Sequence, residues 1–186
     1  MTTSTTTPRR LFIAFAGADR DVKDELLKHI AVLRQVGLID PWDVDHIRPG
    51  DDFERAVTDA VAKADLALIL VTADFLAADL AQDGAFRLLF ERLGADGLRV
   101  IPVLARTCPW TLHPWIGRLN PVPRSGKAVA AYEGDARAAV LAEIAVELVN
   151  VFSLDHPGAR VPPGRQLEVP ELPSCQVHAS GLASDG

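Results

Sequence analysis

The chain has 186 residues, of which 48% are hydrophobic, and this composition favours a packed domain over a disordered chain. Its formal net charge is −6 with acids and bases interspersed, so we expect no general affinity for nucleic acid or anionic membranes. The two cysteines, Cys108 and Cys175, form no CxxC motif and no disulfide framework, which favours a reducing cytoplasm. No segment approaches the ~20 apolar residues of a membrane span.

The first elements predicted are a strand, a helix and a second strand. Residues 11–15 are apolar and are typical of a buried strand. Apolar residues then recur at helical spacing, with Asp19 or Asp21 as a possible cap at the start and Gly37 as the stop signal. Residues 38–42 form the second, short strand.

A tight turn and a helix start follow. Pro49 and Gly50 supply the fixed φ and the permissive φ that such a turn needs. Asp51 or Asp52 can then cap a helix, which the apolar spacing extends to about Lys63.

The rest of the chain predicts three more strands and two more helices. Residues 66–71 are apolar throughout, as expected for a strand covered on both faces. A helix around residues 86–93 and a strand at 100–104 come next. A short strand near 119–122 precedes a last helix from about 135 to 152.

Strands that alternate with helices predict an α/β fold of the flavodoxin-like, doubly wound type, with five parallel strands and helices on both faces. Ligands of such folds bind beyond the carboxyl ends of the strands. The predicted organisation is a disordered N-terminus over residues 1–8, one domain over 9–152, and a Pro/Gly-rich tail or linker over 153–186.

The order of short segments along the chain is its most specific feature. These segments are residues 11–15 with an acid soon after, 37–42, 47–53, 64–65, 71–76, 99–104, 108–110 and 119–123. Together they resemble a bacterial TIR (Toll/interleukin-1 receptor) domain. The resemblance covers roughly residues 9–152 and implies the TIR fold.

The resemblance implies two kinds of activity. Many TIR domains are assembly modules whose BB loop docks against a neighbour, and residues 47–53 correspond to that loop. Other TIR domains cleave NAD at the nicotinamide–ribose bond with a glutamate early in the helix after the third strand. Alignment places this glutamate at Ala85, or at Gly84 if the loop is one residue shorter. Neither side chain can stabilise an oxocarbenium-like transition state.

Asp83 is the nearest acid to the expected glutamate, although capping the following helix is its simpler role. After the first strand, a nucleotide could approach the backbone of Ala16 and Gly17, and Asp19 could contact a ribose. Capping is also the simpler role for Asp19. The histidines lack metal-ligand spacing, so no metal site is predicted.

Six residues in the BB loop and directly before it are predicted to contact partners. They are His46, Ile47, Arg48, Pro49, Gly50 and Asp51. We expect Arg48 to contact a partner, and we expect the flanking Trp42 and Phe53 to be core anchors.

The preferred hypothesis is a TIR signalling and assembly module that binds itself or other TIR domains in a bacterial immune or signalling system, without a cofactor. One alternative is a divergent NAD hydrolase, active on assembly, that uses Asp83 or a carboxylate of a neighbouring protomer. Another is a nucleotide sensor without turnover. NAD is then a substrate or a ligand.

Overall fold

The computed structural model describes residues 7–78, 87–89, 91–92 and 98–155. Its sheet has four parallel strands in the order β2-β1-β3-β4. The strands are β1 (Arg9–Ala14), β2 (Ile39–Trp42), β3 (Leu66–Val71) and β4 (Arg99–Leu104). The strand order steps outward from β1 in both directions, which confirms the predicted doubly wound parallel sheet.

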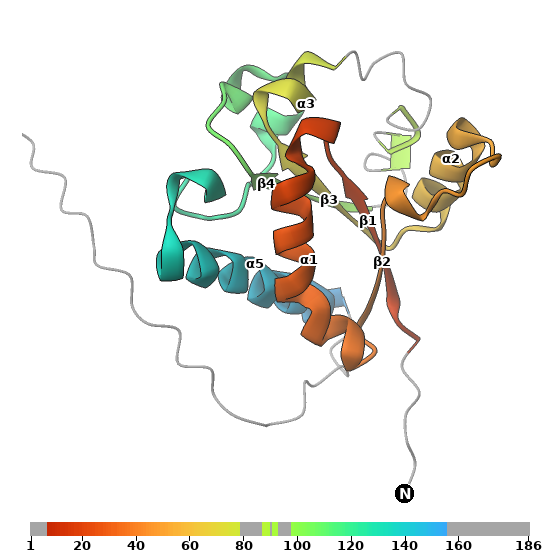
Figure 1. Ribbon diagram of the computed structural model, residues 1–186, viewed down its shortest axis with the longest axis horizontal. Coiled ribbons are helices and arrows are strands. Elements are labelled where there is room, and N and C mark those ends of the chain that lie inside the picture. The colour runs from red at the N-terminus through yellow and green to blue at the C-terminus, as the bar shows by residue number, and fades with distance from the viewer. Residues whose placement is uncertain (1–6, 79–86, 90, 93–97, 156–186) are drawn as a thin grey trace, which may run out of the picture.

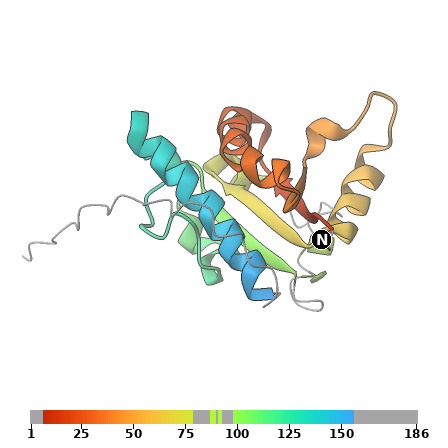
Figure 2. The same ribbon diagram turned by 90° about the horizontal axis from the view of Figure 1, so that it is seen from below.

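Helices cover both faces of the sheet (Figures 1 and 2). The helices are α1 (Arg20–Gln35), α2 (Phe53–Lys63), the short α3 (Ala73–Ala77) and α5 (Gly134–Asp155). Side chains of α1 and α5 share one buried cluster with one face of the sheet. Side chains of α2 share a second cluster with the opposite face. All six residues of the central strand β3 are buried, because both of its faces are covered.

The predicted helix boundaries have visible causes. Gly37 adopts a φ of 72° after α1, and the N–H of Leu38 donates to the carbonyl of Leu33 at 2.9 Å, which closes the helix end. At the start of α2, Asp52 is the N-cap, and its Oδ1 accepts from the N–H of Arg55 at 2.9 Å.

The prediction of five strands was wrong by one within the described residues. In place of a strand at 119–122, Val122 forms an isolated parallel bridge with Val103. The N–H of Val122 donates to the carbonyl of Pro102, and the carbonyl of Val122 accepts from the N–H of Leu104, both at 2.8 Å. The flanking Pro121 and Pro123 have φ fixed at about −65°, which disfavours the extended backbone that a longer strand needs.

Each edge strand of the sheet carries a proline whose nitrogen faces outward. The N–H of Arg9 donates to Leu38, so residues 38, 40 and 42 turn their backbone groups toward β1 and Pro41 turns its own away. The carbonyl of Pro102 accepts from Val122, on the outer side of β4. The sheet therefore loses no internal hydrogen bond to either proline.

Several predictions fall outside the described residues. They concern Asp83, Ala85, the N-terminal segment and the tail, and they stay predictions. In the predicted helix around residues 86–93, residues 87–89 and 91–92 are helical, and Arg92 donates to the carbonyls of Val61 and Ala64. No helix in the described part of the chain is long and apolar enough to span a membrane.

Candidate functional site

Three polar side chains meet where β1, β3 and β4 end. Asp19 and Thr72 are buried, and Thr72 Oγ1 donates to Asp19 Oδ2 at 2.6 Å. Arg106, which follows β4, donates from Nε to Asp19 Oδ1 at 2.8 Å. Both carboxylate oxygens of Asp19 thus have a partner inside the protein, as a buried charge requires.

Arg106 also connects this cluster to the start of α1. One of its terminal nitrogens lies 2.9 Å and 3.0 Å from the two carboxylate oxygens of Asp21. Hydrogen bonds to Asp19 and then to Asp21 raise the pKa of Arg106. Burial opposes ionisation of Asp21, but hydrogen bonds from Val22 and Arg106 outweigh it and lower the pKa of Asp21.

The structure gives Asp19 a role that the sequence did not predict. Asp19 occupies the N-cap position of α1, but its side chain forms no capping hydrogen bond. Its oxygens bond Thr72 and Arg106 instead. The simpler capping role predicted for this side chain was therefore wrong.

The predicted nucleotide-contacting backbone lies beside this cluster. The carbonyl of Ala16 accepts from the N–H of Asp19 at 2.8 Å. Gly17 is exposed, and an added Cβ would meet nothing within 4 Å. Nucleotide binding at Ala16, Gly17 and Asp19 stays a prediction.

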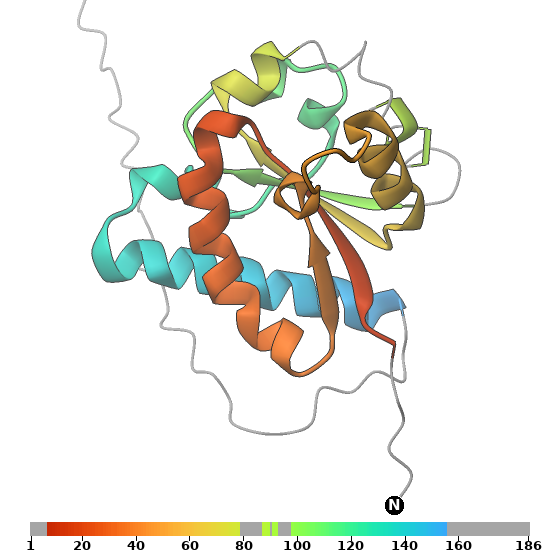
Figure 3. The same cartoon turned by 45° about the vertical axis from the view of Figure 1, so that its right-hand side comes forward.

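Residues 43–53, called the interaction loop below, run from the end of β2 to the start of α2. They lie at the end of the sheet where α3 lies (Figure 3). Its first turn is closed by Asp43, which is buried and whose Oδ1 accepts from the N–H of Asp45 at 2.8 Å. His46 Nδ1 lies 3.3 Å from the backbone nitrogen of Asp43 and completes a capping box. Trp42 is half-buried and stacks between Phe12 and His46.

A buried lysine fixes the base of the loop to α1. Lys23 is 3% exposed, and its Nζ lies 2.6 Å from Asp45, 2.8 Å from Asp24 and 3.6 Å from Asp43. Burial opposes its charge, but the hydrogen bonds to Asp24 and Asp45 prevail and raise the pKa of Lys23. Correspondingly, the hydrogen bond from Lys23 lowers the pKa of Asp45.

The tip of the loop is exposed. The N–H of Arg48 donates to Asp51 Oδ2 at 3.1 Å, and the N–H of Asp51 donates back to the carbonyl of Arg48 at 3.1 Å. Gly50 has a φ of 95°, which confirms the need for glycine in this turn. Phe53 is 59% exposed, so the prediction that it is a core anchor was wrong.

The sequence analysis did not identify the side chains that hold the Asp19 cluster and the base of the interaction loop together. Thr72 and Arg106 each stand directly after a strand end or one residue beyond it, which is where polar residues of a parallel sheet converge. Lys23 carried no such signal, because a lysine among helical residues is usually exposed. No group of three or more potential ligand residues in the described part of the chain is arranged to hold a metal ion.

The chain is similar to known proteins in sequence and in structure. The chain is 36% identical over 119 residues to the protein y4lF from Sinorhizobium fredii, an alignment that covers 64% of this chain and 36% of that protein. The chain therefore spans about a third of the length of this relative. A solved TIR domain, that of the Toll-related receptor TRR-2 from Hydra magnipapillata, superposes with a TM-score of 0.49 and 16% identity, over 75% of this chain and 98% of that one. The TIR domain family profile matches residues 11–141, and the chain belongs to this family.

Proposed function

We propose that this TIR domain is an assembly module that associates with itself or with other TIR domains through the interaction loop. The observation that carries the proposal is the contrast between the base and the tip of that loop. Lys23 and Asp43, at the base, are buried and paired. Arg48, at the tip, is exposed, and so is Phe53, where the loop enters α2.

This contrast is what a docking element needs. A loop that is already ordered loses little conformational entropy when it binds, so more of its contact energy is available for association. Arg48 has no side-chain ion pair with any described residue, and its guanidinium can donate to a carboxylate of a neighbour. Phe53 offers an aromatic ring, and aromatic and arginine side chains dominate the energetics of most interfaces.

Catalysis is not part of this proposal. The position aligned with the family's glutamate holds Ala85, whose methyl group cannot accept a hydrogen bond or stabilise a positive charge. Asp19, which could contact a ribose, already bonds Thr72 and Arg106. The proposal includes a role in a bacterial immune or signalling system, and the bacterial origin of the similar protein y4lF supports the bacterial setting alone.

The test is the oligomeric state of the purified chain as a function of concentration, measured by sedimentation velocity. Arg48→Ala and Phe53→Ser should each weaken the association at least about fivefold, as loss of ~1 kcal/mol from an interface implies. Arg34→Ala, on the exposed end of α1, and Leu112→Ser, at a side chain 81% exposed elsewhere, are matched controls and should change nothing.

Association that is unaffected by the loop variants, or equally weakened by the controls, would overturn the role of the loop. A chain that stays monomeric at all concentrations and binds no other TIR domain would overturn the assembly function itself. Nicotinamide release from NAD by the parent protein would contradict the non-catalytic part of the proposal.

A further inference from the structure

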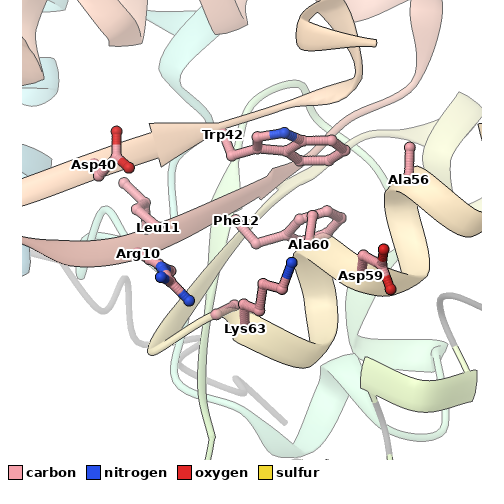
Figure 4. A pocket seen from close by; sticks show the side chains of 10 residues that line it. Arg10, Leu11, Phe12, Asp40, Trp42, Ala56, Asp59, Ala60 and Lys63 are labelled. Atoms are coloured by element: carbon pink, nitrogen blue, oxygen red, sulfur yellow. The ribbon is translucent and has the colours of Figure 1, made fainter. Parts of the chain in front are cut away.

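A cavity with a volume of about 230 Å³ lies between α2 and the β1–β2 edge of the sheet, on the face opposite α1. Figure 4 shows its two walls. Side chains alternate between the faces of a strand, and the register places Arg10 opposite Asp40 and Phe12 opposite Trp42. These four residues therefore line one wall of the cavity from neighbouring strands.

The other wall is one face of a helix. Ala56, Asp59, Ala60 and Lys63 recur at helical spacing along α2 and line the cavity together. The two alanines leave the space open, because a larger side chain at either position would fill it. The residues that bind α2 to the core, Val57 and Val61 among them, lie on a separate, buried stripe.

The floor of the cavity is aromatic. The rings of Phe12 and Trp42 stack with centroids 5.7 Å apart and an interplanar angle of 17°. Phe12 is buried, whereas Trp42 is half-buried and presents part of its surface to the cavity. The stack thus offers an apolar surface for a flat or branched hydrophobic group.

The rim of the cavity carries two positive and two negative side chains, and these do not neutralise one another. Arg10, Asp40, Asp59 and Lys63 are all exposed and all line the cavity. Within the part of the chain that the structure describes, none of them has a side-chain ion pair, even though Arg10 and Asp40 lie opposite each other in register. Such a rim can satisfy both charges of a zwitterion at once.

We infer that this cavity binds a free amino acid with an apolar side chain. Its carboxylate lies toward Arg10 and Lys63, its ammonium group lies toward Asp59, and its side chain packs against Trp42. The cavity is smaller than the 300–1,000 Å³ typical of sites for drug-sized ligands, which fits a ligand of this size. The site adjoins the interaction loop, because Trp42 stacks on His46, but the inference does not depend on the assembly proposal.

The experiment follows the indole N–H signal of Trp42 in NMR spectra of the full chain during titration with three probes. L-phenylalanine carries both charges, N-acetyl-L-phenylalanine lacks the ammonium group, and L-phenylalaninamide lacks the carboxylate. The expected result is a saturable shift with L-phenylalanine and binding about two- to fivefold weaker with each derivative, since an exposed ion pair contributes ~0.4–1 kcal/mol.

Charge variants assign each end of the ligand. Lys63→Gln should weaken L-phenylalanine and the N-acetyl probe at least about twofold and leave the amide unaffected. Asp59→Asn should weaken L-phenylalanine and the amide and leave the N-acetyl probe unaffected. Lys28→Gln, at an exposed lysine of α1, is the control for lost positive charge and should change none of the three.

Filling the cavity provides a test that does not depend on charge. Ala60→Phe should abolish the shift, whereas Ala62→Phe, at an exposed position of the same helix, should preserve it. Absence of a saturable Trp42 shift up to the solubility limit of L-phenylalanine would overturn the inference. Equal binding of the three probes would overturn the zwitterion assignment, and undiminished binding to a folded Ala60→Phe variant would place the ligand elsewhere.

Discussion

Thr72 donates a 2.6 Å hydrogen bond to Asp19 across 53 residues of sequence, and both side chains are buried. The same hydroxyl oxygen accepts from the N–H of Phe75 at 3.1 Å and so caps α3. One side chain therefore holds the loop after β1 and the helix after β3 in a fixed relation.

Replacement of Thr72 by valine removes both hydrogen bonds at nearly constant volume. We expect the free energy of unfolding to fall by about 2–4 kcal/mol, because a buried carboxylate loses a donor and α3 loses its cap. Urea unfolding measures the change. Thr72→Ser keeps the hydroxyl and should lose much less, and equal losses for the two variants would contradict the hydrogen-bonding role.

Lys23 fixes the base of the interaction loop, so Lys23→Met should leave Asp43 buried without its nearby charge. We expect a loss of stability of about 3 kcal/mol, within the range found when one partner of a buried ion pair is removed. Amide hydrogen exchange in residues 43–47 should accelerate as well. Lys28→Met, at an exposed site on the same helix, is the control. Similar exchange rates for residues 43–47 in both variants would refute the role of Lys23 in fixing the loop.

The ion pair of Asp45 predicts an acid-sensitive contribution to stability. The pKa of Asp45 is lowered in the folded protein, chiefly by the hydrogen bond from Lys23, so its carboxylate binds a proton less readily than in the unfolded chain. The stabilisation is therefore present above the ordinary aspartate pKa of about 3.9 and is lost as the pH falls through and below it. Unfolding measured from pH 7 to pH 3 should show parent and Asp45→Asn converging at the acid end, and a constant gap would contradict this.

Substitution of two glycines, Gly50 and Gly17, can distinguish the cost of backbone strain from the cost of steric crowding. An added Cβ meets nothing within 4 Å at Gly50 or at Gly17, but only Gly50 has a positive φ, of 95°. Gly50→Ala should therefore cost about 1–2 kcal/mol of unfolding free energy from backbone strain alone. Gly17→Ala should be neutral or stabilising by up to about 1 kcal/mol. Thermal unfolding measures the stability change of each variant. Equal changes in the two variants would show that strain at Gly50 is unimportant.

The strands and helices were predictable because their signals are local. The apolar run of β3, the Pro49-Gly50 turn and the Asp52 cap each act within a few residues. The candidate site was less predictable, since the partners of Asp19 come from 53 and 87 residues further along the chain. The exposure of Phe53 was not predicted either, because an aromatic residue in the first turn of a helix can face the core or the solvent.

The outward-facing prolines at the two edges of the sheet bear on how copies of this protein can meet. Pro41 on β2 and Pro102 on β4 each lack a backbone donor on the outward side, and on β4 Val122 also occupies the carbonyl of Pro102. A second chain that tried to continue the sheet would find an interrupted ladder on either side, which disfavours cross-β growth. We therefore expect copies of this domain to contact one another through side chains and not through a shared sheet.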